Sequence, residues 1–235
     1  MAVVTARLRA VPAARLHLFL MLVLTFTTGI NDAVGYLGLD KVFTGNMTGN
    51  VVVLGMALVG GTGLPTLGPA LALVGFMAGA AVGGRALKRV TGAWSRGVTV
   101  LLACVAILML VLAAVLFAVG DDPAHGLVVS VTTGAAVAMG LQAATARHVA
   151  VQDVTTVVVT STITGLAADS ILGGGSSVRS ARRFLAVALI LLGAAVGALL
   201  LKVHLGAGLL LAGVVIAVVT VVGALHPGET EETAA

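Results

Sequence analysis

Eight long apolar segments, separated by short charged ones, dominate the chain. They are His17–Gly38, Val42–Gly60, Leu67–Leu87, Val98–Val119, Gly126–Ala146, Val151–Leu172, Phe184–Leu201 and Leu205–Leu225. A helix of about 20 apolar residues is long enough to cross a lipid bilayer. Charged residues make up 9% of the chain and the mean hydropathy is +1.16, whereas about a quarter of the residues in a soluble domain are charged. The pattern therefore predicts an all-α polytopic membrane protein.

The same pattern sets the expected domains and excludes several functions. We expect a basic cytoplasmic tail over residues 1–16, a single membrane domain over 17–225 and an acidic, disordered tail over 226–235. The net charge of +4 comes from Lys and Arg between apolar segments, so we expect no nucleic-acid partner. The sequence has no phosphate-binding loop and no Cys/His cluster with metal-ligand spacing. We therefore expect no cofactor, no metal and no enzymatic activity.

The second half of the chain repeats the first. Three matches occur in the same order: Gly29-Ile30-Asn31 with Gly140-Leu141-Gln142, Thr44–Gly49 with Thr160–Gly165, and Gly79–Gly83 with the identical Gly193–Gly197. Ordered matches of this kind indicate an internal duplication. We assign repeat one to residues 17–119 and repeat two to residues 126–225.

The distribution of charge favours one topology. If all eight segments span, as a 4+4 repeat, Lys and Arg divide almost evenly between the two sides. If segments 42–60 and 151–172 are instead broken or re-entrant, all 13 Lys and Arg residues except Lys41 and Lys202 are cytoplasmic. The positive-inside rule favours this second arrangement. It gives an inverted 3+3 repeat with both termini in the cytoplasm, and the eight-span form is the alternative.

Polar side chains in the first half are the main candidates for a binding site. They are Asn31, Asp32, Thr44, Asn46, Thr48 and Asn50. Polar groups at membrane depth are costly, so they need partners or a function. Asp32 could take up a proton or bind a cation; alternatively, it caps the segment that follows or pairs with Lys41.

The corresponding candidates in the second half are Gln142, Thr160, Thr162 and Thr164. Asp153 is a second candidate proton site, or it pairs with Arg147 or His148 at the surface. Asp169 lies near Arg179 and Arg182 in sequence, and we expect it to be structural. The regularly spaced glycines of both halves suit close packing of helices within the chain or between copies, so a homo-oligomer stays open.

The motifs resemble a known family. Gly29–Ala33, Tyr36-Leu37 and above all Phe43-Thr44-Gly45-Asn46-Met47-Thr48-Gly49-Asn50 are similar to the YoaK-like family, the bacterial domain of unknown function 1275. The resemblance implies a multi-pass protein of the bacterial inner (cytoplasmic) membrane. It implies no substrate and no reaction.

These observations predict a transporter or channel for a small polar solute or ion, with the site between the two polar broken segments. Proton coupling through Asp32 is part of this hypothesis. The alternatives are a membrane-embedded enzyme or lipid-binding protein that uses the same cleft, and a sensor or assembly protein without flux. The expected partners are the lipid bilayer and an unknown solute or ion.

Overall fold

The computed structural model describes residues 11–60, 63–149, 159–169 and 177–226, and all regular structure in these ranges is helical. The helices are α2 (Ala13–Gly38), α3 (Met47–Leu58), α4 (Leu67–Leu87), α5 (Arg96–Val119), α6 (His125–Val149), α7 (Val159–Ala168), α8 (Ser177–Leu200) and α9 (Ala207–Leu225). The predicted all-α fold is therefore confirmed.

Among the described residues, six helices are long and apolar enough to cross a membrane: α2, α4, α5, α6, α8 and α9. The chain is a multi-pass membrane protein. The helix α3 has 12 residues, so it is about 18 Å long and shorter than the apolar layer of about 30 Å. The helix within segment 42–60 is thus too short to span the apolar layer by itself. Its counterpart at 151–172 lies partly outside the described residues.

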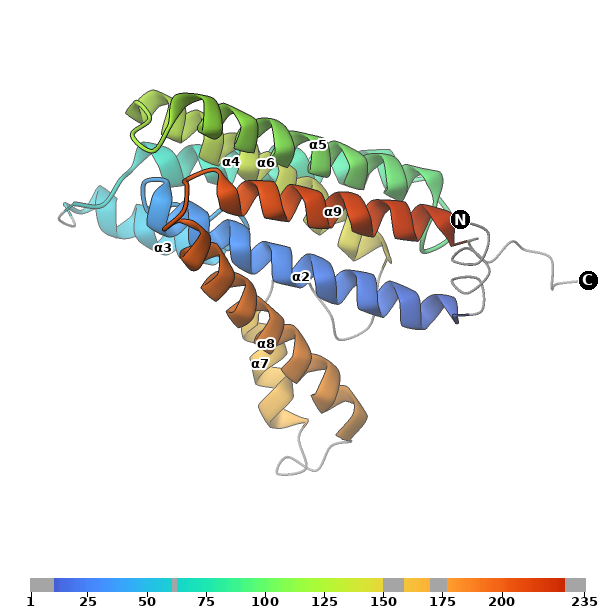
Figure 1. Cartoon of the computed structure of the whole chain (residues 1–235). Helices are drawn as coiled ribbons and strands as arrows, with labels where there is room; N and C mark the ends of the chain where they lie inside the picture. Colours follow the sequence, from blue (N-terminus) through green and yellow to red (C-terminus); the bar gives the residue numbers. More distant parts are fainter. Residues whose placement is uncertain (1–10, 61–62, 150–158, 170–176, 227–235) are drawn as a thin grey trace, which may run out of the picture.

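The long helices form a bundle (Figure 1). The two ends of this bundle differ in charge. The first described turn of α2 and the end of α9 meet at one end, where His226 Nε2 lies 2.9 Å from the Val11 carbonyl oxygen. The α4–α5 loop lies at this end too, because Trp94 stacks on His17 with ring centroids 5.7 Å apart. This end, which we call the terminal end, carries Arg85, Lys88, Arg89, Arg96 and Arg147.

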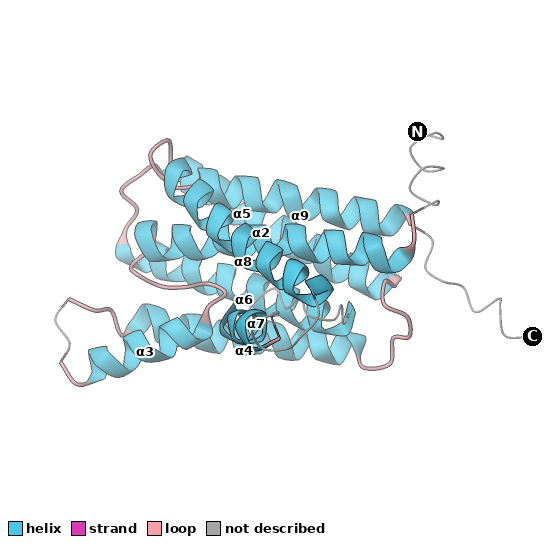
Figure 2. Cartoon of the chain, turned by 90° about the horizontal axis from the view of Figure 1, so that it is seen from below, coloured by secondary structure: helices cyan, strands magenta, loops and turns pink. Residues whose placement is uncertain are grey.

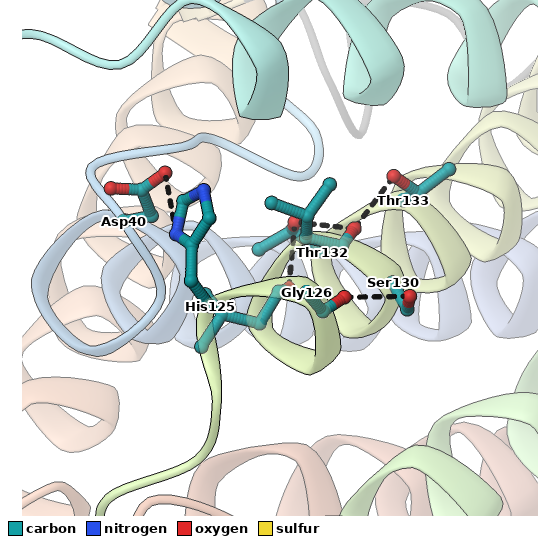
Figure 3. A network of polar contacts seen from close by, with 8 residues as sticks. Asp40, His125, Gly126, Ser130, Thr132 and Thr133 are labelled. Carbon is teal, nitrogen blue, oxygen red and sulfur yellow. Dashed lines mark hydrogen bonds and ion pairs between the residues drawn. The ribbon is translucent and has the colours of Figure 1, made fainter.

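At the opposite end, which we call the loop end, acidic residues are more frequent. Asp121 Oδ1 accepts a hydrogen bond of 2.8 Å from the backbone N–H of Leu205 and so ties the α5–α6 loop to the α8–α9 loop. Asp40 and His125 also lie at the loop end (Figure 3). The basic residues of α4, α5, α6 and the α4–α5 loop thus lie opposite the acidic residues of the loop end.

Glycines set the closest helix contacts. A Cβ on Gly29 of α2 would collide with the Ile190 carbonyl of α8, and a Cβ on Gly193 of α8 would collide with the Phe26 carbonyl of α2. The contact between α4 and α6 is built in the same way: Gly79 faces the backbone of Val137, and Gly140 faces the backbone of Phe76. Each pair of helices therefore approaches to backbone contact because it lacks side chains there.

These contacts couple the two sequence repeats reciprocally. The first long helix of each half, α2 or α6, packs against the helix of the other half that contains the Gly-Ala-Ala-Val-Gly run, α8 or α4. The glycines expected to allow close contact do so within one chain. Figures 1 and 2 show α8 crossing the bundle at a wide angle, with α7 beside its first half.

The interior and the surface fit a bilayer. The core contains large apolar side chains such as Leu24, Ile30, Met109, Met139 and Ile216, all fully buried. The outside of the long helices carries exposed large apolar side chains, such as Met77, Ile107, Leu191 and Val218. Contiguous apolar surface of this kind is unusual on a soluble monomer. Lipid tails would cover it.

Candidate functional site

Asp32 holds the segment that precedes α3. Its Oδ1 atom accepts hydrogen bonds from the backbone N–H groups of Thr44 (3.0 Å), Gly45 (2.7 Å) and Asn46 (3.3 Å). Three successive amides that converge on one oxygen form an anion-binding nest. The segment folds back onto α2 because Gly45 has no side chain there; a Cβ would come within 3.1 Å of the Thr28 methyl group.

This geometry bears on the alternatives for Asp32. The carboxylate lies at the N-terminal, positive end of α3, as a capping group does. The Lys41 ammonium donates to the Gly63 carbonyl oxygen at 3.2 Å instead. Lys41 and Asp40 both have positive φ, 55° and 60°. This uncommon conformation in the α2–α3 connection turns the chain back toward Asp32.

Asn46 and Asn50 make local hydrogen bonds. The Asn50 side chain donates to the Phe43 carbonyl at 2.6 Å and accepts from the Phe43 N–H at 2.9 Å. Asn46 Oδ1 accepts from the Gly49 N–H at 3.2 Å and caps α3. Asn50 and Thr44 are buried, while Asn46 and Thr48 are exposed. The two asparagines thus close the turn that starts α3.

Asn31 and Gln142 behave differently, although they are also amides. Both are fully buried, on α2 and α6 respectively. Asn31 Nδ2 lies 3.3 Å from the Met139 sulfur, and Gln142 Nε2 lies 3.3 Å from Thr28 Oγ1. Each amide therefore contacts the residue one turn before the other amide. Asn31 Oδ1 and Gln142 Oε1 are buried and have no hydrogen-bond partner among the residues that the structure describes.

The threonines of the second half lie on α7, which packs along α8 (Figure 2). Thr162 is buried, Thr160 and Thr164 are exposed, and the Thr164 hydroxyl donates to the Thr160 carbonyl at 2.9 Å. Arg183 of α8 holds the end of α7 through the Gly165 carbonyl and the Asp169 carboxylate. Asp169, which was expected to be structural, thus forms an ion pair with Arg183. Asp153 lies outside the described residues.

A surface pocket opens at the loop end. It has a volume of about 380 Å³, and its lining comprises Asp40, His125 and the residues 63–67 that lead into α4. Asp40 Oδ2 and His125 Nδ1 are 4.0 Å apart, and Figure 3 shows the two side chains facing each other at the start of α6. The sequence gave no indication of this pair. Asp40 follows the end of α2, and no motif connects it to His125.

The structure therefore divides the predicted site residues into separate groups. Asn31 and Gln142, from different halves, lie at one helix contact. Asp32 of α2 and Asn50 of α3 instead bond to the turn before α3, which contains Thr44 and Asn46. The described contacts of Thr160 and Thr164 are within α7. Sequence reasoning missed Thr28 and Met139, the partners of the amides. Thr28 lies three residues before Asn31 on α2, and Met139 lies three residues before Gln142 on α6, each on the same helix face as that amide.

Comparison with known proteins identifies relatives of the chain. Residues 20–222 match the family described as "Protein of unknown function (DUF1275)". A curated relative, the UPF0700 transmembrane protein YoaK of Bacillus subtilis (strain 168), is 32% identical over 151 residues. That match covers 64% of this chain and 65% of YoaK, so it spans slightly less than two thirds of the relative's length. No solved structure matches the chain.

Proposed function

The chain belongs to the DUF1275 family, and from this premise we propose that it is a transporter or channel for a small polar solute or ion. The observation that carries the proposal is the pair of amides at the α2–α6 contact. A buried polar atom without a partner costs about 1–3 kcal/mol. Here two such atoms, Asn31 Oδ1 and Gln142 Oε1, occur in membrane-spanning helices. A purely structural contact would be more stable with apolar side chains.

The packing of the two halves supports an alternating mechanism. Three spans per half require the halves to have opposite orientations, which is the inverted-repeat plan of many transporters. The reciprocal glycine contacts of α2 with α8 and of α6 with α4 are those expected from such a repeat. Asn31 and Gln142 occupy matching positions in the two halves. The site would thus lie where the halves meet.

Asp32 supplies a route for proton coupling, and for this reason we favour a carrier over a channel. Its carboxylate oxygen holds three backbone amides of the turn before α3. Hydrogen bonds to a charged acceptor are about twice as strong as neutral ones. Proton uptake by Asp32 would weaken all three bonds together and release the turn. Since Asn31 precedes Asp32 on α2, movement of this turn would be felt at the amide pair.

We place the protein in the cytoplasmic membrane, with both termini inside. The test uses single cysteines in a Cys104→Ala background and an impermeant thiol reagent added to intact cells. Cysteines in the basic Arg85–Arg96 segment should stay unlabelled, whereas a cysteine at Asp122 should react. Labelling of the Arg85–Arg96 segment from outside would overturn the inverted-repeat topology.

Transport itself is tested with purified protein in liposomes. Osmotic swelling reports the entry of small neutral solutes, and ion-sensitive dyes report the movement of H⁺, Na⁺ and K⁺. We expect flux above that of protein-free liposomes, a loss of flux in Asn31→Leu and Gln142→Met, and its retention in Ser130→Ala, an exposed control on α6. Absence of flux for every probe would favour the enzyme, lipid-binding or sensor alternatives.

A further inference from the structure

Buried threonines of α2 and α6 use their hydroxyl protons within their own helices. Thr25, Thr28 and Thr145 each donate their hydroxyl proton to a backbone carbonyl of their own helix, at 2.9, 3.0 and 2.8 Å. Thr132 does the same. These hydroxyl groups therefore present oxygen lone pairs, rather than protons, to their surroundings. The same holds for Thr27, which donates to Leu24 at 2.8 Å.

The two amides add to this excess of acceptors. The NH₂ group of Gln142 points to Thr28 Oγ1 and the Leu24 carbonyl, at 3.3 and 3.5 Å. The NH₂ group of Asn31 points to the Met139 sulfur, a weak acceptor. The carbonyl oxygens of both amides remain unpaired and buried. The contact thus contains two free carbonyl oxygens, while the NH₂ groups of both amides already point to other acceptors.

Free acceptors of this kind select the charge of a ligand. An anion would meet mostly oxygen lone pairs, because the NH₂ groups already point to other acceptors. A divalent cation of the Mg²⁺ or Ca²⁺ type is usually bound through carboxylates, but the side chains at this contact are neutral. Asp32, next in the chain, commits Oδ1 to three backbone amides. Neutral oxygens suit a monovalent cation, as backbone carbonyls do in cation filters.

We propose that Asn31 Oδ1 and Gln142 Oε1 bind an alkali metal cation between α2 and α6, with one ligand from each half of the chain. The inference rests on the proposed function, because it names the ion that this site takes as substrate or coupling ion. Thr28 Oγ1 orients the Gln142 amide so that the Gln142 oxygen stays free. Water or a cosubstrate would complete the coordination. The ion then links the two halves where they meet.

The test measures thermal unfolding of the purified full-length protein in detergent. The probes are LiCl, NaCl and KCl, each against choline chloride at the same ionic strength, so that screening is constant. A cation that binds the native state raises its apparent Tm by mass action. We expect at least one alkali cation to raise Tm by several degrees with saturation. Equal Tm values in all four salts would overturn the proposal and would indicate that water is the partner of the amide oxygens.

Two variants test the ligands without relying on transport. Asn31→Leu and Gln142→Met keep the side-chain volume and remove the unpaired oxygen, so in choline chloride they should unfold at or above the wild-type Tm. Their response to alkali cations should disappear, while Ser130→Ala should respond as the wild type does. A full response in both variants would overturn the assignment of ligands.

A third variant covers the case that an apolar replacement fails to fold. Gln142→Glu keeps the shape and adds a negative charge, so it should shift the cation titration to at least tenfold lower concentration. An unchanged titration would overturn the role of Gln142. The liposome assay separates this inference from the proposed function. Flux without any change of Tm in alkali salts would overturn the cation site but not transport. A change of Tm in alkali salts without flux would overturn transport but not the cation site.

Discussion

The two halves of the molecule share their helix contacts but fix their short polar helices in opposite ways. In the first half, the Asp32 carboxylate holds the N-terminal side of α3. In the second half, the Arg183 guanidinium holds the C-terminal end of α7 through Gly165 and Asp169. Each charge complements the helix end that it meets, since helices are positive at the N-terminus and negative at the C-terminus.

The two halves thus share their helix contacts but differ in the charged groups that could act in function. The glycine contacts and the amide pair occur in both halves, whereas Asp32 has no acidic counterpart: the residue after Gln142 is Ala143. The duplicated helix contacts can form a symmetric binding site, whereas the single acidic group, Asp32, can make only the first half respond to pH. The following predictions test this difference between the halves, starting from the shared helix contacts.

The largest effect is expected from the shared glycine contacts. Gly79→Leu and Gly193→Leu should each abolish most of the folded yield, because both positions face backbone that cannot move away. We expect a cost of about 3 kcal/mol or more for each. Gly84→Leu, on the same helix as Gly79 but facing open space, is the matched control. Yield and Tm of the purified variants are the readouts. If one variant is tolerated and the other is not, the two contacts are not equivalent.

A smaller effect is expected from the turn of the first half. Asn50→Leu removes both bonds to Phe43 and leaves a backbone N–H and a C=O without their partner. Both bonds are only partly buried, so each unpaired group should cost about 1 kcal/mol, and the combined loss of about 2 kcal/mol should appear as a lower Tm. Asn46→Ser should stay close to wild type because serine caps helices about as well as asparagine. A wild-type Tm for Asn50→Leu would show that this turn does not contribute to stability.

Much of the helix arrangement could be predicted from sequence, because apolar runs and glycine spacing are local patterns. Apolar runs define the spans, and the segment Leu67–Leu87 coincides with α4. The spacing of Gly79 and Gly193 predicted close contact, but not the partner helix, since spacing defines a face and not its neighbour. The helix α8 begins at Ser177, before the apolar segment Phe184–Leu201, and the arginines in between are good helix formers.

The polar residues were harder to interpret for a related reason. Asn31, Asn46 and Asn50 look equivalent in sequence, yet Asn46 and Asn50 bond within their own turn while Asn31 reaches a helix more than 100 residues away. The turn that brings residues 44–46 to Asp32 contains Asp40 and Lys41 in a left-handed conformation. Glycine usually signals that conformation, and here no glycine does.

The smallest effect on stability, and the sharpest for function, concerns Asp32 itself. Asp32→Asn keeps an acceptor oxygen for the three backbone amides but removes the charge, so the loss of stability should be about 1 kcal/mol. Proton-coupled flux in liposomes should nevertheless be lost, since asparagine does not titrate.

Lys41→Ala is the matched comparison for Asp32→Asn. The Lys41 ammonium bonds to the Gly63 carbonyl and is exposed, so this variant should stay within about 0.5 kcal/mol of wild type and keep its flux. If Lys41→Ala instead reproduced the loss seen in Asp32→Asn, the two residues would act as an ion pair. If Asp32→Asn kept both the rate and the pH profile of the wild type, Asp32 would only anchor the turn. The amide pair at the α2–α6 contact would then be the part of the site that both halves share and the only part that acts in transport.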